Sequence, residues 1–565
     1  MHLLALSGLH VAWLAAVARV ACAAVGGGPV ARAWTGAACA ALYALFAGPI
    51  PSLLRAVASE GYAALARVTK RGADPAQSLA VGALVLLALR PGWAHDLGFQ
   101  LSCAATLGLV TLSAPFAEPF ARRAWLRPVA AALATTAAAQ LLALPVLLAR
   151  FHALPWTGLA ANLAAVPLSE LLLAAAWAGG ALEALAPGLG GPWLSACEPL
   201  ARGIAWVAAR AAEWPGALLA SGSDPAAAWL AAVGAALLAL ALPPPRALAA
   251  RLHALRRPRA ERAVLAWTGA ATCATALVAA LAARPLAPPP GTWWLVVLDV
   301  GQGDALAIAA ARGWWLVDSG PRTPRWDAGE GTVLPFLRAV GVRRLERLVL
   351  THDDGDHAGG ARAVLRGAPP AELDAAAPRP GVRGPLARFA GRRRTFALGR
   401  GDTLQGVPPA LVLWPPRPGE PGDTLAARGD NAASVVLVVG EGAGRALLTG
   451  DADSLVEAAL AVTPPVAVLK AGHHGSGSSS GAAFVARARP AAVAVSAGRR
   501  NAYGHPHPRA LERLRSRGAR VDRTDREGTL WYALDAHGAR RLDWRAGEPW
   551  ARPRPVWRAA PAPRP

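Results

Sequence analysis

The sequence predicts a polytopic α-helical membrane region followed by an α/β domain. Hydrophobic residues make up 54% of the 565 residues and charged residues only 17%, whereas a soluble globular protein carries about a quarter charged residues. Apolar runs near twenty residues long recur up to residue 284, and this is the length that crosses a bilayer as a helix. After a Pro-rich linker at 285–292, short β-like runs alternate with helical patterns. A wholly soluble or disordered chain is therefore disfavoured.

The first 284 residues contain the candidate membrane spans, and we expect eight or nine crossings. Alanine dominates many of the runs, so their boundaries are weakly marked. The five cysteines all lie in this region, without a CxxC pair or zinc-type spacing, and are predicted to be small buried hydrophobes. The candidate spans are 3–25, 31–50, 76–95, 98–117, 129–149, 158–180, 198–220, 226–242 and 263–283.

Arginine placement predicts the orientation of this region, because short cytoplasmic loops retain positive charge. One arginine cluster lies at 122–127 and another at 246–262, with four candidate spans between them, so both loops can be cytoplasmic. The last span then carries the remaining chain to the exoplasmic side. The formal net charge of +22 also favours an anionic partner, either nucleic acid or lipid headgroups.

The region 293–540 is predicted to be one α/β domain, and the Pro/Arg-rich tail 541–565 is expected to be disordered. Helical patterns lie near 331–341, 358–366, 453–462 and 507–517. Between them, 367–425 is rich in Pro, Gly and Arg and is expected to form long surface loops. The predicted strands are 293–299, 305–310, 314–318, 346–350, 410–414, 434–440, 445–449, 466–470, 491–496 and 529–534.

The segment LVLTHDDGDHAGG at 348–360 places four possible metal ligands directly after a predicted strand. They are His352, Asp354, Asp356 and His357. Imidazole and carboxylate groups are the ligands that hard or borderline divalent metals take. The plain alternative is a solvated acidic turn, which further ligand candidates downstream make less attractive.

Those further candidates also follow predicted strands. Asp451 ends LLTGD, and His473 and His474 lie in LKAGHHGS. Because sheet geometry can bring the loops after neighbouring strands to one rim, the three segments together predict a metal centre there. A carboxylate between two ions can bridge them, so we expect two divalent metals. The pattern does not choose between His473 and His474.

This set resembles the metallo-β-lactamase superfamily, which implies an αββα sandwich over most of 293–540. In LDVGQGDA and LVDSG, the resemblance places Asp304 and Asp318 behind the metal ligands, although Gly and Asp are also ordinary turn residues. Asp354 replaces the usual second histidine of the metal loop, and Asn431 and Ser434 occupy the stretch in which a further histidine is sought. The resulting oxygen-rich site leaves manganese, magnesium and zinc open.

The oxygen-rich variant and the membrane motifs together resemble the ComEC family, the inner-membrane channel proteins of bacterial DNA uptake. The family's usual region ahead of residue 2 is missing from this sequence. The resemblance otherwise covers nearly the whole chain. Its membrane motifs are HLLALSGLHV at 2–11, PSLLRA at 51–56, GFQLSCAATLGL at 98–109 and QLLALPVLLARFHALPWTGLAANLAAVPL at 140–168.

The resemblance implies passage of single-stranded DNA through the membrane region. Because phosphates cannot cross lipid, polar residues within the spans are candidates for the pathway. Arg55 is the strongest, and His10, Gln100 and Asn162 accompany it. Interhelical hydrogen bonding is the alternative for each of them.

In the soluble half, we hypothesise that a metal-activated hydroxide attacks a phosphodiester, with Asp356 at the reacting centre. His505, in NAYGHPHP, is expected to contact phosphate or donate a proton, and a surface-turn histidine is the alternative. Lys470, Asn431 and Ser434 are expected to contact substrate. The exoplasmic domain would then degrade the strand that is not transported.

The expected partners are DNA, the lipid bilayer and an exoplasmic DNA receptor, with a homo-oligomer possible. No P-loop is visible, so a cytoplasmic ATP-driven helicase or translocase would supply the force. Two rival functions remain open. One is a membrane-anchored metallohydrolase acting on a small ester or another phosphodiester, and the other is a DNA conduit with an inactive hydrolase domain.

Overall fold

A computed structural model describes residues 8–543 and 554–558 apart from short gaps, and the described chain divides into two compact units, 1–282 and 283–565. Each unit is described by itself. Most of the second arginine-rich loop, at 246–262, lies outside the described residues. The gaps are at 49, 71–73, 121–122, 124, 215–216, 222–224, 242–257, 311–312, 325, 378, 380–387, 390–393 and 407.

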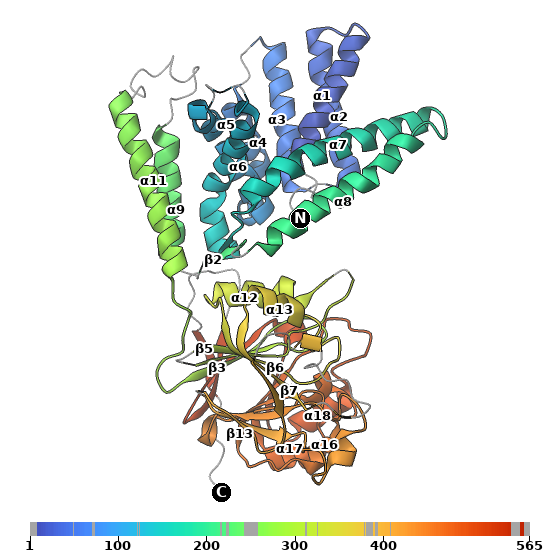
Figure 1. The fold of residues 1–565 in the computed structure, drawn as a ribbon, viewed down its shortest axis with the longest axis vertical. Coiled ribbons are helices and arrows are strands. Elements are labelled where there is room, and N and C mark those ends of the chain that lie inside the picture. Colours follow the sequence, from blue (N-terminus) through green and yellow to red (C-terminus); the bar gives the residue numbers. More distant parts are fainter. Residues whose placement is uncertain are drawn as a thin grey trace. The chain divides into compact units, whose positions relative to one another are not determined.

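The first unit is helical (Figure 1). Several helices begin with residues that favour a helix N-terminus. Proline occupies the first turn of α2, α3 and α4, and the Asp96 carboxylate accepts the Phe99 N–H at 2.8 Å to cap α5. The helices are α1 (Gly8–Ala24), α2 (Pro29–Ala47), α3 (Pro51–Val68), α4 (Pro75–Leu89), α5 (Leu97–Ala117), α6 (Arg127–Val146), α7 (Gly158–Leu185), α8 (Gly191–Glu213), α9 (Pro225–Ala241) and α11 (Arg259–Ala282).

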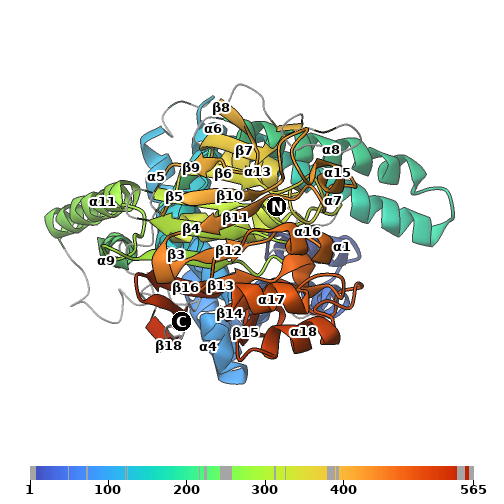
Figure 2. The same ribbon diagram turned by 90° about the horizontal axis from the view of Figure 1, so that it is seen from below.

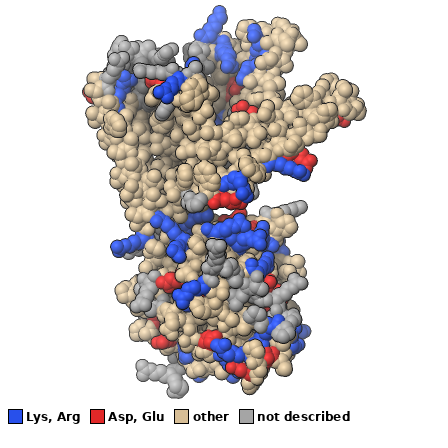
Figure 3. All heavy atoms as spheres, in the orientation of Figure 1, with Lys and Arg blue, Asp and Glu red and all other residues tan. Residues whose placement is uncertain are grey.

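Each of the nine expected spans overlaps one of these helices, although α8 begins and ends seven residues earlier than the expected span 198–220, and α3 is an additional helix. The sequence of α3 does not predict a membrane span, because Arg55, Glu60 and Arg67 interrupt the apolar pattern. Among the described residues, five helices are long and apolar enough to cross a membrane, and α1, α4 and α9 contain shorter apolar stretches. In Figure 3 this unit is mostly tan, whereas blue and red side chains are spread over the second unit.

Small residues allow the helices of the first unit to approach closely. A Cβ atom on Gly108 of α5 would lie 2.2 Å from the Ala138 carbonyl oxygen of α6. Between α9 and α11, a Cβ on Gly234 would lie 2.5 Å from the Cys273 sulfur. Such contacts are typical of membrane helices, where close backbone packing replaces the hydrophobic effect as the driving force for association.

The second unit contains two mixed sheets (Figure 2). The nine-stranded sheet has the order β18-β17-β16-β3-β4-β5-β6-β7-β8, and the seven-stranded sheet has the order β15-β14-β13-β12-β11-β10-β9. The first comprises β3 (Trp293–Val297), β4 (Leu306–Ala310), β5 (Gly313–Val317), β6 (Leu345–Leu350), β7 (Pro370–Ala376), β8 (Arg394–Leu398), β16 (Leu530–Asp535), β17 (Gly538–Asp543) and β18 (Arg554–Arg558). The second comprises β9 (Thr403–Leu404), β10 (Ala410–Trp414), β11 (Val436–Val439), β12 (Ala446–Leu448), β13 (Val466–Lys470), β14 (Pro490–Val495) and β15 (Arg520–Arg523).

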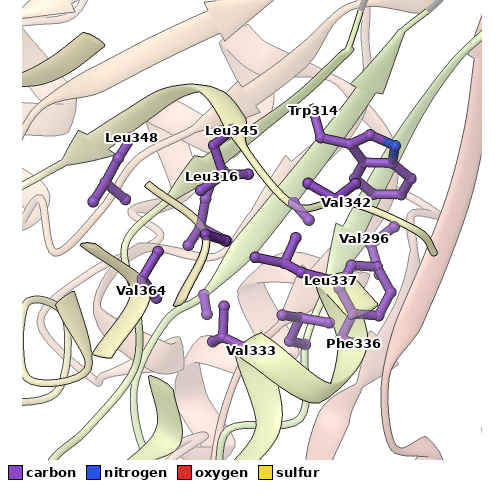
Figure 4. Packing of buried hydrophobic residues seen from close by; sticks show 14 of the residues in the cluster. Val296, Trp314, Leu316, Val333, Phe336, Leu337, Val342, Leu345, Leu348 and Val364 are labelled. Atoms are coloured by element: carbon purple, nitrogen blue, oxygen red, sulfur yellow. The ribbon is translucent and has the colours of Figure 1, made fainter. Parts of the chain in front are cut away.

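Three buried clusters hold these layers together. One lies between the nine-stranded sheet and α12/α13, where Trp314, Phe336 and Leu337 pack together (Figure 4). A second joins the inner faces of the two sheets, and a third packs α16 and α17 on the seven-stranded sheet. The order is helix, sheet, sheet, helix, which confirms the expected αββα fold. The helices are α12 (Leu334–Ala339), α13 (Ala361–Gly367), α15 (Asp423–Ala426), α16 (Ser454–Ala459), α17 (Ala482–Ala488), α18 (Pro508–Arg515) and α19 (Thr524–Glu527).

Two expectations about irregular segments differ from the structure. The region 367–425, expected to form loops, contains β7, β8 and β9 as well as the expected β10. In the tail expected to be disordered, β17 continues to Asp543 and β18 pairs with it. In both places Pro, Gly and Arg obscure the alternation, and pairing with neighbouring strands at the margins of a formed sheet supplies the order.

Candidate metal centre

The expected ligands come from three loops that follow strands β6, β12 and β13. β5 pairs with β6 and β12 with β13 in parallel, so the carboxyl ends of the two strands in each pair meet at one sheet edge. The loop between β3 and β4 adds Asp304, and the end of β5 adds Asp318. The structure therefore brings residues that are distant in sequence to one rim.

His357 is fully buried and held in one orientation. Its Nδ1 lies 2.7 Å from Asp318 Oδ2, and a carboxylate only accepts, so Nδ1 carries the proton. The same carboxylate accepts the Thr351 N–H at 2.8 Å and the Thr351 hydroxyl at 2.7 Å. His357 Nε2 then faces Asp451 Oδ1 at 3.1 Å. Asp318 thus braces the metal loop, although its backbone adopts a left-handed conformation with φ of 59°.

His474 is fixed in the same way from the opposite side. Its Nδ1 lies 3.1 Å from the Ser496 carbonyl oxygen, which can only accept, and its Nε2 lies 3.3 Å from His357 Nε2. Asp451 Oδ2 is 3.6 Å from the same Nε2. Ligand atoms of Asp304, His357, Asp451 and His474 all lie within 4.8 Å of one another, and these four residues are buried.

This arrangement fits a divalent cation. With both Nδ1 atoms donating, the two imidazoles point their Nε2 atoms at each other and at a carboxylate. Lone pairs and negative charge that converge without a proton between them repel, and a cation removes that repulsion. The donor set of imidazole and carboxylate suits zinc or manganese.

His352 adds a third imidazole at the centre. Its ring centroid lies 4.1 Å from that of His357, and its buried Nε2 has no hydrogen-bond partner among the described residues. Its Nδ1 lies 3.0 Å from Thr351 Oγ1 and 3.4 Å from Ser434 Oγ, so hydroxyls hold the ring. A buried nitrogen without a hydrogen bond is costly in the absence of a ligand.

Ser434, which is expected to contact substrate, lies behind the centre and is fully buried in this structure. Its Oγ accepts the Asp451 N–H at 3.1 Å and thereby positions the ligand loop. A Cβ on Gly450, whose φ is 49°, would lie 2.1 Å from that oxygen. Only glycine fits between Ser434 and the end of β12.

Lys470, which is expected to contact phosphate, also lies behind the centre. The side chain is fully buried; its Nζ pairs with Asp304 and donates to the Gly450 carbonyl oxygen at 3.0 Å. The sequence pattern at the end of β13 singles out Lys470 but does not indicate the direction in which its side chain extends. Lys470 thus acts as an internal cation beside Asp304.

Four further expected residues lie at the rim. Asp354 Oδ2 is 3.4 Å from His352 Nε2, Asp356 Oδ2 is 3.3 Å from His474 Nε2, and His473 Nε2 is 3.6 Å from Asp451 Oδ2. These three side chains are partly exposed. The fourth, Asn431, lines a pocket of about 350 Å³ together with Asp354. The other lining residues are Arg428, Gly429, Asp430, Ala432 and Asp453.

His505 lies beside the two histidines of the HHGS segment. Its ring centroid is 5.6 Å from that of His473 and 6.5 Å from that of His474. Gln302, from the loop between β3 and β4, approaches His505 Nδ1 at 3.5 Å and accepts the Gly498 N–H at 3.1 Å. Sequence reasoning missed Gln302, although it stands two residues before Asp304 in the same motif.

The pKa shifts reflect the concentration of charge at the centre. Burial by itself lowers the pKa of His474, but the carboxylates of Asp451 and Asp304 overcome this effect and raise it to about 9. Burial likewise opposes the protonated form of His357, and Asp451 and Asp318 raise its pKa well above the usual value. The centre therefore favours positive charge, which a metal ion would supply in place of protons.

His505 differs, because burial and the neighbouring His473 and His474 lower its pKa. Its ring is therefore neutral at pH 7. A neutral ring retains one N–H donor and suits a hydrogen bond to phosphate better than transfer of a proton.

In the membrane unit, Arg55 is buried, and its Nε donates to Ser102 Oγ of α5 at 2.8 Å. Asn162 approaches Thr136 Oγ1 of α6 at 3.5 Å, and Gln100 donates to the Ala94 carbonyl oxygen at 2.7 Å. His10 belongs to α1, but its side chain lies outside the described residues. These contacts are compatible with packing or with a polar pathway.

An ion pair within this unit was missed. Arg19 of α1 lies 2.7 Å from Glu60 of α3, and both side chains are mostly buried. The two residues are 41 positions apart, and α3 was not counted as a span, so no local pattern could pair them.

Each of the two units is similar to a known protein family. Residues 1–246 match the family model described as Competence protein, and residues 298–499 match the Metallo-beta-lactamase superfamily model. The first unit is thus similar to the competence-protein family, and most of the second unit is similar to the metallo-β-lactamase superfamily. This confirms the resemblance drawn from the motifs.

Among curated proteins, the chain is 29% identical to "ComE operon protein 3" of Bacillus subtilis, over 94% of this chain and 67% of that protein. It is 33% identical to "Competence protein ComA" of Neisseria gonorrhoeae, over 46% of this chain and 34% of that protein. The chain therefore spans about two thirds of the first relative and a third of the second.

Among solved structures, Zn(2+)-bound PqqB from Methylobacterium extorquens is 13% identical, over 43% of this chain and 99% of that chain, with a TM-score of 0.28. This TM-score is too low to support a fold assignment, which rests instead on the strand order of the two sheets and on the family model.

Proposed function

We propose that this protein is an inner-membrane channel for single-stranded DNA in natural transformation, and that its C-terminal domain is an exoplasmic metal-dependent nuclease. The observation that carries the proposal is that one chain joins a competence-protein region to a converged set of imidazoles and carboxylates. A small-ester hydrolase would leave the membrane region without a use. A purely passive conduit would leave the oriented ligand set without one.

We infer that His352, His357, Asp451 and His474 would hold a divalent ion, with Asp354, Asp356 and His473 at the rim available for a second. Manganese, zinc and magnesium are the candidate ions. Such an ion supplies a bound water of lowered pKa and offsets charge on phosphoryl oxygens. Asp304 keeps a supporting role, because the ammonium group of Lys470 already neutralises its carboxylate.

The remaining steps belong to side chains of this protein. Asp318 and Ser496 hold two imidazoles with Nε2 toward the centre. The partly exposed carboxylate of Asp356 is placed to accept a proton from water at the rim. The neutral ring of His505 would donate a hydrogen bond to a phosphate oxygen and so place the phosphodiester against the centre.

In the membrane unit, Arg55 would offer its guanidinium to passing phosphates, and Asn162 and Gln100 would add polar contacts. An exoplasmic receptor would deliver duplex DNA, and a cytoplasmic ATP-driven helicase or translocase would pull the surviving strand. A homo-oligomer would offer a further way to enclose the path. These partners follow from the proposed function and from the absence of a P-loop motif in the sequence.

The test uses the full chain, purified in detergent and supplied with manganese, magnesium or zinc. We expect cleavage of DNA that Asp451→Asn abolishes and Asp353→Asn retains. Asp353 is a matched control because it lies in the same ligand loop but contacts Arg388 at 3.3 Å. A folded, metal-loaded chain that cleaves neither single- nor double-stranded DNA would overturn the nuclease part, and unimpaired transformation in a deletion strain would overturn the channel part.

A further inference from the structure

A continuous series of ring contacts leads from the buried centre to the surface of the domain. The His352 and His357 rings lie 4.1 Å apart, and the His357 and His474 rings lie 5.1 Å apart. The series continues from His474 to His505 at 6.5 Å and from His505 to Tyr503 at 5.9 Å. The last two rings are nearly parallel, at 26°. Tyr503 is therefore the outer end of a stack that begins at the metal ligands.

Tyr503 is unusually open for an aromatic residue. Its exposed fraction is 72%, compared with 41% for Trp326 and 40% for Phe396, the other exposed large aromatics among the described residues of this unit. A single exposed hydrophobic residue is ordinary by itself. Here, however, the inner side of the ring stacks on His505, so the exposed surface extends an existing stack.

The loop that carries Tyr503 is held by its own hydrogen bonds. Asn501 Oδ1 accepts the N–H groups of Tyr503 and His505 at 3.1 and 3.0 Å. Asn501 Nδ2 donates to the carbonyl oxygens of Gly498 and His505 at 2.8 and 2.5 Å. These bonds order the backbone of the loop, and the ring itself is placed by its stack on His505, which lowers the entropic cost of binding a planar ligand.

The surroundings of Tyr503 suit an anionic ligand. Arg500 and Arg509 are exposed around the loop, as is Arg499, whose Nε donates to the Asp525 carbonyl oxygen at 3.1 Å, and the first acidic residue after the loop is Glu512. Arginines at such positions attract a phosphate backbone without reading its sequence. An aromatic face beside positive charge is the combination by which proteins hold single-stranded nucleic acid.

We propose that Tyr503 is a stacking platform for one unpaired nucleobase, which holds the neighbouring phosphodiester at the metal centre. This inference rests on the proposed nuclease function and specifies its substrate. A base inside a duplex is covered on both faces by its neighbours, so it cannot stack on Tyr503 without leaving the helix. The domain therefore acts on single-stranded DNA or on a frayed end in preference to the interior of a duplex.

The experiment measures binding to the full chain in detergent, in an Asp451→Asn background that stops cleavage. Two probes of equal length are compared by fluorescence anisotropy, oligothymidine and a fully abasic oligonucleotide. We expect Tyr503→Ala and Tyr503→Leu to weaken binding of oligothymidine by roughly 5- to 100-fold and to leave the abasic probe unchanged. Tyr503→Phe keeps the aromatic face and should restore binding to within about twofold of the parent.

Arg500→Ala is the contrasting variant. It should weaken binding of both probes alike and reduce the salt dependence, because its contact is with phosphate. Equal weakening of the binding of both probes by Tyr503→Ala would overturn the platform and indicate a loop defect. Normal binding of oligothymidine by both Tyr503→Ala and Tyr503→Leu would also overturn the platform. If the parent binds neither probe and the unmutated chain cleaves no DNA, the proposed function itself fails, and the platform fails with it.

Discussion

The ammonium group of Lys470 pairs with the carboxylate of Asp304 in a fully buried position directly behind the candidate metal ligands. Burial by itself raises the pKa of Asp304, but Lys470 and His474 overcome this effect and lower it. The backbone N–H of Asp304 also donates to the Asp356 carbonyl oxygen at 3.1 Å. Asp304 therefore links the β3–β4 loop to Lys470 at the end of β13 through its side chain, and to the loop that carries Asp356 through its backbone.

The first prediction concerns this pair. Lys470→Met removes the cation and leaves the buried Asp304 carboxylate without its main partner, which should cost about 3–5 kcal/mol of unfolding free energy. Pulse proteolysis of the full chain across a urea series, following the C-terminal domain, measures the loss. Arg417→Met is the control, because the Arg417–Asp402 pair at 2.5 Å is half exposed and should contribute no more than about 1 kcal/mol. Equal losses in the two variants would contradict the role given to Lys470.

The second prediction concerns metal binding. Adding an ion at about 100 times its dissociation constant should stabilise the folded domain by about 2.7 kcal/mol. Thermal unfolding of chelator-treated chain with and without manganese, zinc or magnesium measures the shift. Asp451→Asn should remove the shift, because Asp451 contacts both His357 and His474.

Asp353→Asn should keep the metal-induced shift, since Asp353 pairs with Arg388 instead of the centre. The readout does not depend on activity, so it separates metal binding from catalysis. A shift that persists in Asp451→Asn would place the ion elsewhere.

The ligand loops were predictable because each follows a strongly patterned buried strand. β6, β12 and β13 lie within one residue of their expected limits, and the residues just after them supply the centre. The roles of Lys470 and Ser434 were not predictable. Their type suggested contact with substrate, and only the packing of Asp304 and Gly450 against them shows that they face inward.

The fold was predictable where apolar residues alternate or run continuously, and it was missed where polar residues interrupt the pattern. β7 begins with Pro370 and includes Glu372 and Asp374, which hide this strand, the last but one of the nine-stranded sheet. The sheet accommodates them because Arg347 of β6 pairs with both carboxylates. Compensation of this kind depends on the neighbouring strand and cannot be read from β7 itself.

The third prediction is a pH dependence from this buried network. Burial raises the pKa of Asp374 to about 6, although Arg347 opposes the rise. The folded pKa lies above the unfolded value, so the stabilisation is complete below about pH 4 and is lost as the pH rises through about 6. Asp374→Asn should therefore gain stability relative to the unmutated chain between pH 4 and pH 7, by up to about 3 kcal/mol.

Urea unfolding at a series of pH values tests this, with Asp402→Asn as control. Asp402 lies near the surface, where its pair with Arg417 is within reach of water. A constant difference between Asp374→Asn and the unmutated chain across this range would contradict the assignment.

The fourth prediction concerns the Arg19–Glu60 pair of the membrane unit. Removing either partner leaves one charge unpaired between helices, so Arg19→Leu and Glu60→Leu should each lower thermal stability in detergent. The double variant should recover part of the loss. The exposed pair Arg202–Glu198 on α8 is the matched control, with a coupling of about 0.5 kcal/mol or less. Additive losses at Arg19 and Glu60 would show that the two charges do not depend on each other.

The fifth prediction tests the proposed orientation of the C-terminal domain. All five cysteines lie in the membrane unit, so one added cysteine reports on the domain. Ser516 is exposed after α18, and Ser516→Cys changes only one atom. If α11 carries the chain out of the cytoplasm, a membrane-impermeant maleimide should label this variant in intact spheroplasts and leave the unmutated chain unlabelled. Labelling that appears only after the membrane is permeabilised would place the domain in the cytoplasm, where it could not meet incoming DNA before transport.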